Sequence, residues 1–135
     1  MNDAVFAIFG EQVVASLATL NPDGTPRATP LHTVTDGQAV YWFSPATAVH
    51  SHNIAQDNRV SLCLASPDES HGLRGVYIAG RAELVADADR RRIVELYTAR
   101  TGGFPAQFAD WRAYALPVGK LDKQKSTGNC WYFYS

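Results

Sequence analysis

The chain has 135 residues, of which 46% are hydrophobic and 19% charged, and its formal net charge at pH 7 is -1. This length fits one domain and is too short for two full cores. Because a near-neutral chain offers no broad field to a phosphate backbone, we expect no nucleic-acid partner, and any anion must be held by a few placed groups.

Membrane and metal functions also lack support in the sequence. No segment has the roughly 20 apolar residues that a spanning helix needs. The N-terminus shows no basic start followed by an apolar run, so we expect a cytoplasmic protein. Cys63 and Cys130 are far apart and not in a ligand-spaced pair. We therefore expect no metal site, and Cys63 is interpreted as a buried free thiol.

The first third of the chain predicts a short helix followed by three strands. A capping candidate, Asp3, begins an amphipathic helix over residues 3–11. Two turns follow, Asn21–Gly24 and Asp36–Gly37, in which glycine accepts a positive φ. They separate strand patterns that predict a three-strand meander over residues 13–20, 25–35 and 38–44.

The remaining chain alternates strands with two helices. Apolar residues at helical spacing predict helices over 46–56 and 88–100, the second ended by Gly102-Gly103. Residues 60–65 form a near-continuous apolar run of the kind buried on both faces. Further strands are expected at 75–85, 112–121 and 130–134, the last two around a polar turn. This order predicts a mainly β fold with inserted helices, a six- to seven-stranded antiparallel barrel in one domain, 1–135.

The strand from Arg27 to His32 is the first candidate for a binding segment. Side chains alternate along a strand, so Arg27, Thr29 and Leu31 share one face, and Ala28, Pro30 and His32 share the other. A proline inside a strand marks an edge, a bulge or a place where a ligand replaces a neighbour. Arg27 supplies a planar fork suited to phosphate. The alternative is an edge strand that bears a surface arginine.

The second candidate is the segment from Trp42 to Ile54, where a strand passes directly into a helix. Such a junction presents free backbone N–H groups and the positive end of the helix dipole, which suits a phosphate. His50 and Ser51 can complete its shell. His50 and His52 cannot chelate one ion, since residues two apart on a helix face different directions.

Other patterns carry less chemistry. The run Arg90-Arg-Arg92 is interpreted as a solvated helix face. No Ser-His-Asp set or glycine-rich phosphate loop is present, so no catalytic residue is identified. A protein without its own proton-transfer groups fits a reaction that a cofactor carries.

These segments together resemble the FMN-binding split-barrel family that includes pyridoxamine 5′-phosphate oxidase. The resemblance covers roughly residues 12 to 86 and depends on order and spacing. Its motifs are Val14–Leu20, Asn21–Pro26, Arg27–His32, Val40–Ser44, His50–Ile54, Asn58–Leu62 and Gly80–Ala82. It implies a split β-barrel and a homodimer whose flavin cleft lies between the subunits.

The resemblance also implies a set of FMN-binding residues. The strand comprising Arg27, Ala28, Thr29, Pro30, Leu31 and His32 is expected to lie along the flavin, with Arg27 at the phosphate. Phe43 and Ser44 would continue the site, with Ser44 donating to the phosphate. His50 stands where many members carry a lysine and Val49 where the oxidases carry an arginine. Gly75 stands where the oxidases use a glutamine near the ring.

Departures from the family pattern limit the implied activity. The oxidases have a lysine at the His32 position, and their later Tyr, Arg and Ser set is missing from residues 93–112. We therefore expect a flavin-dependent oxidoreductase for an unidentified small molecule, and no true pyridoxamine 5′-phosphate oxidase activity. The alternative is a non-enzymatic carrier or binding protein for flavin, haem or a deazaflavin. Because His50 titrates near neutrality, FMN affinity is expected to fall from about pH 6 to about pH 8.5.

Overall fold

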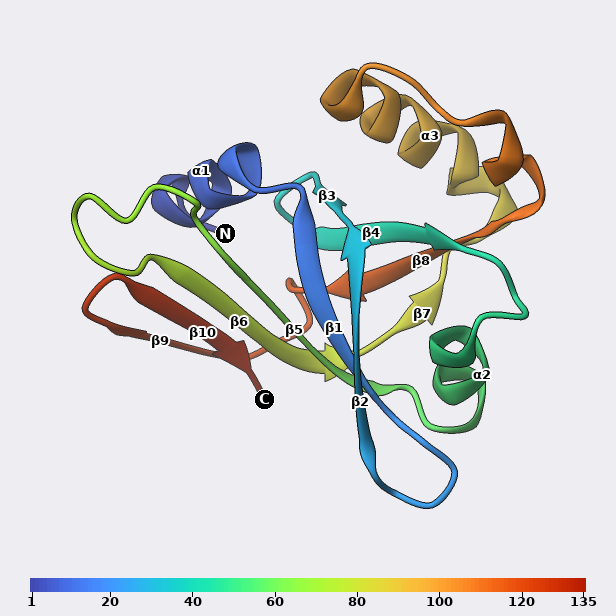
Figure 1. The fold of residues 1–135 in the computed structure, drawn as a ribbon, viewed down its shortest axis with the longest axis horizontal. Helices are drawn as coiled ribbons and strands as arrows, with labels where there is room; N and C mark the ends of the chain where they lie inside the picture. Colours follow the sequence, from blue (N-terminus) through green and yellow to red (C-terminus); the bar gives the residue numbers. More distant parts are fainter.

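The computed structural model describes all 135 residues and contains two β-sheets with helices between and around them (Figure 1). The larger sheet has six strands in the order β2-β1-β5-β6-β10-β9, and the smaller has four in the order β3-β4-β8-β7. The elements are α1 (Asp3–Glu11), β1 (Val14–Leu20), β2 (Pro26–His32), β3 (Val34–Thr35), β4 (Ala39–Ser44), α2 (Val49–Gln56), β5 (Arg59–Ala65), β6 (Gly75–Arg81), β7 (Glu83–Leu84), α3 (Asp87–Thr101), the 3-10 helix η1 (Ala106–Asp110), β8 (Arg112–Pro117), β9 (Lys123–Thr127) and β10 (Cys130–Tyr134).

Local sequence explains the first elements. The Asn2 side chain caps α1 by accepting a hydrogen bond from the Val5 N–H at 2.9 Å. Val5, Ile8 and Phe9, which recur at helical spacing, are the buried residues of this helix. Gly24, in the turn between β1 and β2, has a φ of 84°, a conformation that side-chain-bearing residues rarely adopt. The predicted helix at 3–11 is confirmed with the same bounds.

Strand β4 is the element that joins the two hydrophobic cores, because its side chains are buried on both faces. Val40 and Trp42 belong to a main core of 18 buried residues, filled also by α1 and the inner face of the large sheet. Tyr41 and Phe43 point the other way, into a cluster of eight buried residues beneath α3. Figure 1 shows α3 lying over the small sheet, and α2 below it, after the loop that leaves the arrowhead end of β4.

The mainly β fold with inserted helices is confirmed, but the strands differ from the expected meander. The stretch 25–35 breaks at Thr33, which is buried and donates its backbone N–H to the Val13 carbonyl at 2.8 Å. This contact ends β2 in one sheet and starts β3 in the other. Ten strands form instead of six or seven, and β6 pairs with β10 in parallel, so the barrel is not wholly antiparallel.

Two further expectations about strands are wrong. The polar turn expected before residue 130 contains strand β9, whose five residues are all exposed and therefore show no apolar alternation. Strand β5 is buried on one face only, since Arg59 and Ser61 are exposed. Cys63 is a free thiol, as predicted, but it lies half-buried on that outer face.

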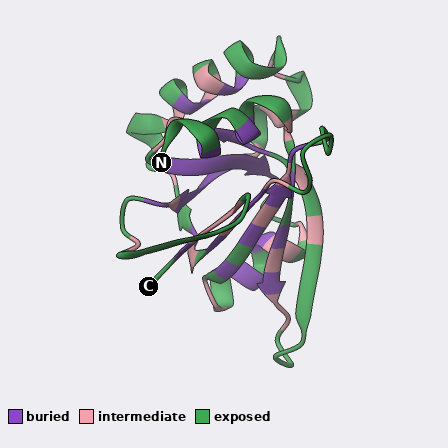
Figure 2. Cartoon of the chain, turned by 90° about the vertical axis from the view of Figure 1, so that its left-hand side faces the viewer, coloured by how far each residue is buried: buried purple, intermediate pink, exposed green.

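No segment of the chain packs on the outer face of the large sheet. Small side chains occupy its centre, and Ser16, Ala28, Ser61 and Ala79 are all exposed. Figure 2 shows buried residues concentrated in the interior strands and exposed residues along the outer sides of the helices. None of the helices is both long and apolar enough to cross a membrane.

Candidate functional site

Two polar side chains from different elements meet where β4 passes into α2. Ser44 is the last residue of β4, and His50 lies in the first turn of α2. The His50 Nε2 and Ser44 Oγ atoms are 2.7 Å apart, which is hydrogen-bond distance. Ser44 is only 3% exposed, so this contact fixes the histidine ring against the end of the strand.

Arg27, near the start of β2, completes this group. The pKa of His50 is lowered from its ordinary value, first by burial and second by the positive charge of Arg27. The imidazole is therefore mostly neutral at pH 7. Arg27 itself is exposed, and although its backbone pairs with Thr19 of β1, its side chain makes no hydrogen bond or ion pair. We call Arg27, Ser44 and His50 the Arg27 group. It combines a free cation with a hydroxyl and an imidazole.

Helix α2 is held in place by a buried asparagine. Asn53, 2% exposed, donates from Nδ2 to the Thr19 Oγ1 at 3.1 Å and to the Asn21 Oδ1 at 3.0 Å. These bonds tie the helix to the end of β1 and so position His50. The N-cap residue, Ala48, offers no side-chain acceptor to the first turn. The backbone N–H groups there have no side-chain cap, which is the condition for binding an anion.

Strand β2 runs from Arg27 along an open edge of the large sheet. It pairs only with β1, in register from Leu20↔Pro26 to Val14↔His32. Ala28 and Pro30 are exposed on the outer face, and Thr29 and Leu31 are half-buried on the inner face. An edge position explains how the strand tolerates a proline. The edge leaves backbone groups of β2 available to a ligand or a partner chain.

His32 lies at the other end of β2 from Arg27, beside α3. Its Nδ1 is 3.3 Å from the Tyr97 hydroxyl, whose pKa is raised by burial. Together with Phe104 and Phe108, these residues line a pocket of about 640 Å³. Tyr97 was not predicted as a functional residue, because its helical spacing fits a core position equally well.

The other predicted site residues are more dispersed. Val49 begins α2 and is 47% exposed, so it faces solvent near the Arg27 group. The Phe43 side chain is buried in the cluster beneath α3, with its ring centroid 4.9 Å from that of Phe104. Gly75 lies in β6, which two strands separate from β2 in the sheet order. One chain therefore brings neither Gly75 nor the Phe43 ring to the Arg27 group.

The arginine run of α3 is only partly a solvated face, which corrects the sequence interpretation. Arg90 donates to the Trp111 carbonyl at 2.6 Å and lies 5.3 Å from the Phe43 ring centroid. Arg92 pairs with Asp36 at 2.9 Å. Only Arg91 conforms to the expectation, with 91% of its side chain exposed. Arg90 and Arg92 hold α3 and η1 against the small sheet, and so shape the pocket beside His32.

Comparison with known proteins places this geometry in context. The model of a family described as pyridoxamine 5′-phosphate oxidase matches residues 1–119. No curated protein sequence matches the chain.

Three solved structures show the same fold. A protein of unknown function from Agrobacterium tumefaciens str. C58 has a TM-score of 0.74 and 24% identity over 84% of this chain, which spans about half (51%) of that protein. A heme binding protein from Mycobacterium smegmatis has a TM-score of 0.73 and 22% identity, covering 96% of this chain and 59% of the other. An F420 reductase has a TM-score of 0.69 and 22% identity, covering 87% and 94%.

Proposed function

The chain belongs to the pyridoxamine 5′-phosphate oxidase family, and from this premise we propose that it binds FMN as an oxidoreductase acting on a small molecule. The observation that carries the proposal is the Arg27 group. At the uncapped start of α2, Ser44 contacts His50, and Arg27 from β2 is near enough for its charge to lower the pKa of His50. A free guanidinium, a hydroxyl and backbone N–H groups are the donors that a phosphate requires.

Each member of the Arg27 group has a distinct task toward the phosphate. Arg27 supplies the charge and can donate two parallel hydrogen bonds. Ser44 donates its hydroxyl hydrogen, while His50 orients that hydroxyl across their 2.7 Å contact. When a phosphate dianion lies beside the ring, it favours the imidazolium, so binding is coupled to proton uptake by His50.

The remaining predicted residues extend the site along β2. Thr29 and Leu31 direct their backbone groups to β1, which leaves the Ala28 N–H and carbonyl and the Pro30 carbonyl at the open sheet edge, where they can hydrogen-bond a flat polar ring. FMN, when bound, supplies the redox chemistry by accepting electrons from one substrate and passing them to another. The chain's part is to bind and orient it and to shape the space for the small molecule.

We place the small-molecule substrate at the His32 end of the strand. The pocket there is bordered by His32, Tyr97 and the aromatic residues Phe104 and Phe108. The His32–Tyr97 contact orients the imidazole next to the pocket. Aromatic walls favour a substrate with a flat apolar part.

The cleft is proposed to form between two copies of this chain. The centre of the outer face of the large sheet carries small residues, beside the stacked rings of Tyr77 and Tyr132, and its side chains are exposed or half-buried. Small side chains allow two sheets to approach closely. A second copy would bring Gly75 toward the flavin, which one chain does not do. Sedimentation of the flavin-loaded protein is expected to give a dimer, and a flavin-loaded monomer would refute the shared cleft.

A carrier or binding function without catalysis is the second candidate. The observation that favours it is the weak positive charge at the phosphate end, where Val49 is apolar and the pKa of His50 is lowered. The heme binding protein and the F420 reductase among the similar structures extend this candidate to haem and deazaflavin ligands.

Absorbance spectroscopy separates these candidates. The protein is purified, incubated with FMN, freed of unbound ligand and examined for a flavin spectrum, with haem and F420 incubated in parallel. The oxidoreductase proposal expects bound flavin that NADH or NADPH bleaches and an acceptor restores. Bound flavin that neither reductant bleaches favours the carrier. A protein that takes up no FMN contradicts both flavin functions.

A further inference from the structure

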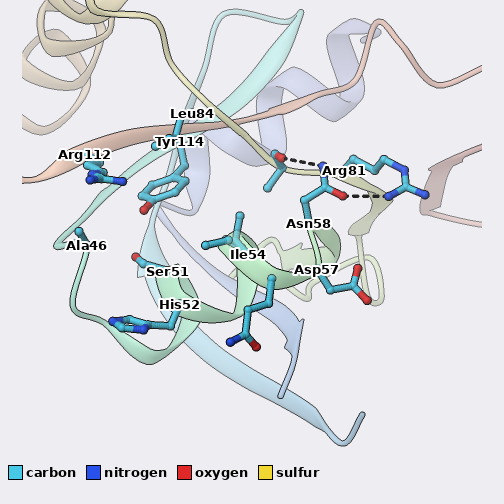
Figure 3. Close-up of a pocket in the computed structure, with 13 residues that line it drawn as sticks. Ala46, Ser51, His52, Ile54, Asp57, Asn58, Arg81, Leu84, Arg112 and Tyr114 are labelled. Atoms are coloured by element: carbon cyan, nitrogen blue, oxygen red, sulfur yellow. Dashed lines mark hydrogen bonds between the residues drawn. The ribbon is translucent and has the colours of Figure 1, made fainter. Parts of the chain in front are cut away.

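A separate pocket of about 710 Å³ lies between α2 and the strands β6, β7 and β8 (Figure 3). Neither Arg27, Ser44 nor His50 lines it, although it borders the proposed phosphate site, because Arg112 in its wall pairs with Ser44 across β8 and β4. Its volume is in the range of small-molecule sites in proteins. Of its residues only Ser51 has been named above, as a candidate for the phosphate shell, and the structure places it in this pocket instead.

One end of this pocket gathers polar groups that donate hydrogen bonds. In Figure 3 the Tyr114 hydroxyl points toward Ser51, and Arg112 and His52 lie on the same side. The backbone of Arg112 pairs with Ser44 of β4, but its side chain makes no hydrogen bond or ion pair, so its guanidinium is free. A free cation beside two hydroxyl groups is an arrangement that suits an anion.

Ser51 gives independent evidence for a ligand at this end. The residue is 3% exposed, and its Oγ has no hydrogen-bond partner. Buried hydroxyl groups in native proteins nearly always have a partner, because leaving one unpaired costs free energy. A ligand atom that accepts the Ser51 hydrogen would remove this cost.

The remaining walls of the pocket are apolar near its centre and charged at the far end. Ile54 and Leu84 lie on opposite sides of the space, with Tyr114 between them and Arg112. At the far end Asp57 pairs with Arg59 at 2.6 Å, and Arg81 donates to the Asn58 Oδ1 at 2.8 Å. The free guanidinium of Arg112 is thus separated by an apolar centre from charges that already have partners.

We propose that this pocket binds a small organic anion, a carboxylate or a phosphate ester that carries one apolar group. Its charged end would contact Arg112, the Tyr114 hydroxyl and the Ser51 hydroxyl, and its apolar group would pack between Ile54 and Leu84. The ring of Tyr114 also stacks on the fully buried Trp42, with centroids 5.9 Å apart, so a ligand here contacts the main core through one residue.

Benzoate and phenyl phosphate are the probes for this site, and benzyl alcohol is the neutral control. Each is titrated into the isotope-labelled full chain, and amide shifts are followed by NMR. One or both anions are expected to shift the signals of Ser51, Arg112 and Tyr114, while benzyl alcohol at the same concentration does not. Shifts by benzoate alone identify a carboxylate ligand, and shifts by phenyl phosphate alone a phosphate ester.

Two variants and a matched control sharpen the test. Arg112→Gln is expected to weaken anion binding about tenfold or more, through the loss of charged hydrogen bonds. Ser51→Ala is expected to weaken it several-fold without lowering the melting temperature. Arg91→Gln removes the same charge from an exposed site on α3 and is expected to change nothing.

The proposal is overturned if neither anion shifts these signals, or if Arg112→Gln binds them as tightly as the unchanged protein. It is also overturned if the shifts gather at Arg27 and His50 and disappear in Arg27→Gln, since the anions would then occupy the proposed phosphate site. The proposal also expects Arg112→Gln to change FMN affinity less than about threefold, and a larger change would overturn it. The NMR titration needs no flavin, so its outcome is independent of the function proposed above.

Discussion

Two sides of one short helix illustrate two ways of preparing a ligand site. On one side of α2, His50 is already hydrogen-bonded to Ser44, and the free group is an exposed arginine from another strand. On the other side, the adjacent residue Ser51 is buried with no partner for its hydroxyl, inside a formed pocket. Successive residues of a helix point about 100° apart, so one step along the chain separates the two environments.

The two sites should respond to a ligand in different ways. At the Arg27 group a ligand adds charge neutralisation to bonds that already exist, so its effect depends on electrostatics and pH. At Ser51 a ligand satisfies an unpaired group, so its effect depends on the fit of one hydroxyl and one cation. Changes to each side should therefore produce different signatures.

The largest effect is expected from Arg27→Gln on the phosphate side. Loss of the only free cation in the Arg27 group should weaken FMN binding about 100-fold, which is about 2.7 kcal/mol. Quenching of flavin fluorescence during titration measures this. Arg59→Gln, which removes an exposed arginine outside the group, is the control and should bind FMN normally. Equal affinity in the Arg27 variant would exclude Arg27 from the phosphate site.

Both sides of α2 depend on one anchor, the buried side chain of Asn53. Asn53→Ala removes two hydrogen bonds to Thr19 and Asn21 and leaves the buried Thr19 hydroxyl without its donor. We expect the free energy of unfolding in urea to fall by about 2 kcal/mol. Gln56→Ala, on the exposed part of the same helix, should change it by less than about 0.5 kcal/mol. An unchanged stability in Asn53→Ala would show that α2 is held by other contacts.

A smaller effect is expected from pH, and only on the His50 side. The pKa of His50 in the free protein is lowered by burial and by Arg27. A bound phosphate dianion raises that pKa, so binding takes up a proton between the two values. FMN affinity should therefore fall about tenfold from about pH 6 to about pH 8.5, and His50→Lys should flatten the curve. A flat profile in the unchanged protein would remove His50 from the phosphate shell.

The lowered pKa of His50 also makes the free energy of unfolding depend on pH. The unfolded chain binds the His50 proton more readily than the folded chain, so this group favours folding at pH above its ordinary value of 6.5. Its contribution should disappear as pH falls below that value toward the folded-state pKa. Urea titrations of the FMN-free protein at pH 7 and pH 5.5, compared with the same pair for His50→Gln, measure it.

The smallest effect is expected from Ser51→Ala on stability. Because the Ser51 hydroxyl has no partner, its removal should change the free energy of unfolding by less than about 0.5 kcal/mol, and alanine has the higher helix propensity. Thermal unfolding without ligand tests this. A loss above about 1 kcal/mol would show that the hydroxyl has a partner in the free protein.

The sequence predicted the features that local rules control. The bounds of α1 and the turns at Gly24 and Gly37 follow from single residues and short spacing, although the cap is Asn2 and not the expected Asp3. The passage from β4 to a helix after Ser44 was also predicted, but α2 begins at Val49 and not at residue 46. The crossing of the chain at Thr33 was missed because it depends on a long-range bond to Val13. Strand β9 was missed because all of its residues are exposed and its pairing comes from β10.

Long-range packing also determined which site residues were found. The association of Ser44 with His50 was predicted, since only a short loop separates them and the family resemblance supported it. The pairing of His32 with Tyr97 spans 65 positions, and the approach of Arg112 and Tyr114 to α2 needs the register of β8 against β4. No local pattern carries that register, so the second pocket was not predicted.

A comparison of FMN with riboflavin tests the proposed phosphate site most directly, because the two ligands differ only in the phosphate. Both are titrated into the flavin-free protein at pH 6.5 and into Arg27→Gln under the same conditions. We expect FMN to bind the unchanged protein about 100-fold more tightly than riboflavin, and this preference to disappear in the variant. Equal affinities for the two ligands in the unchanged protein would contradict a phosphate site formed by Arg27, Ser44 and His50.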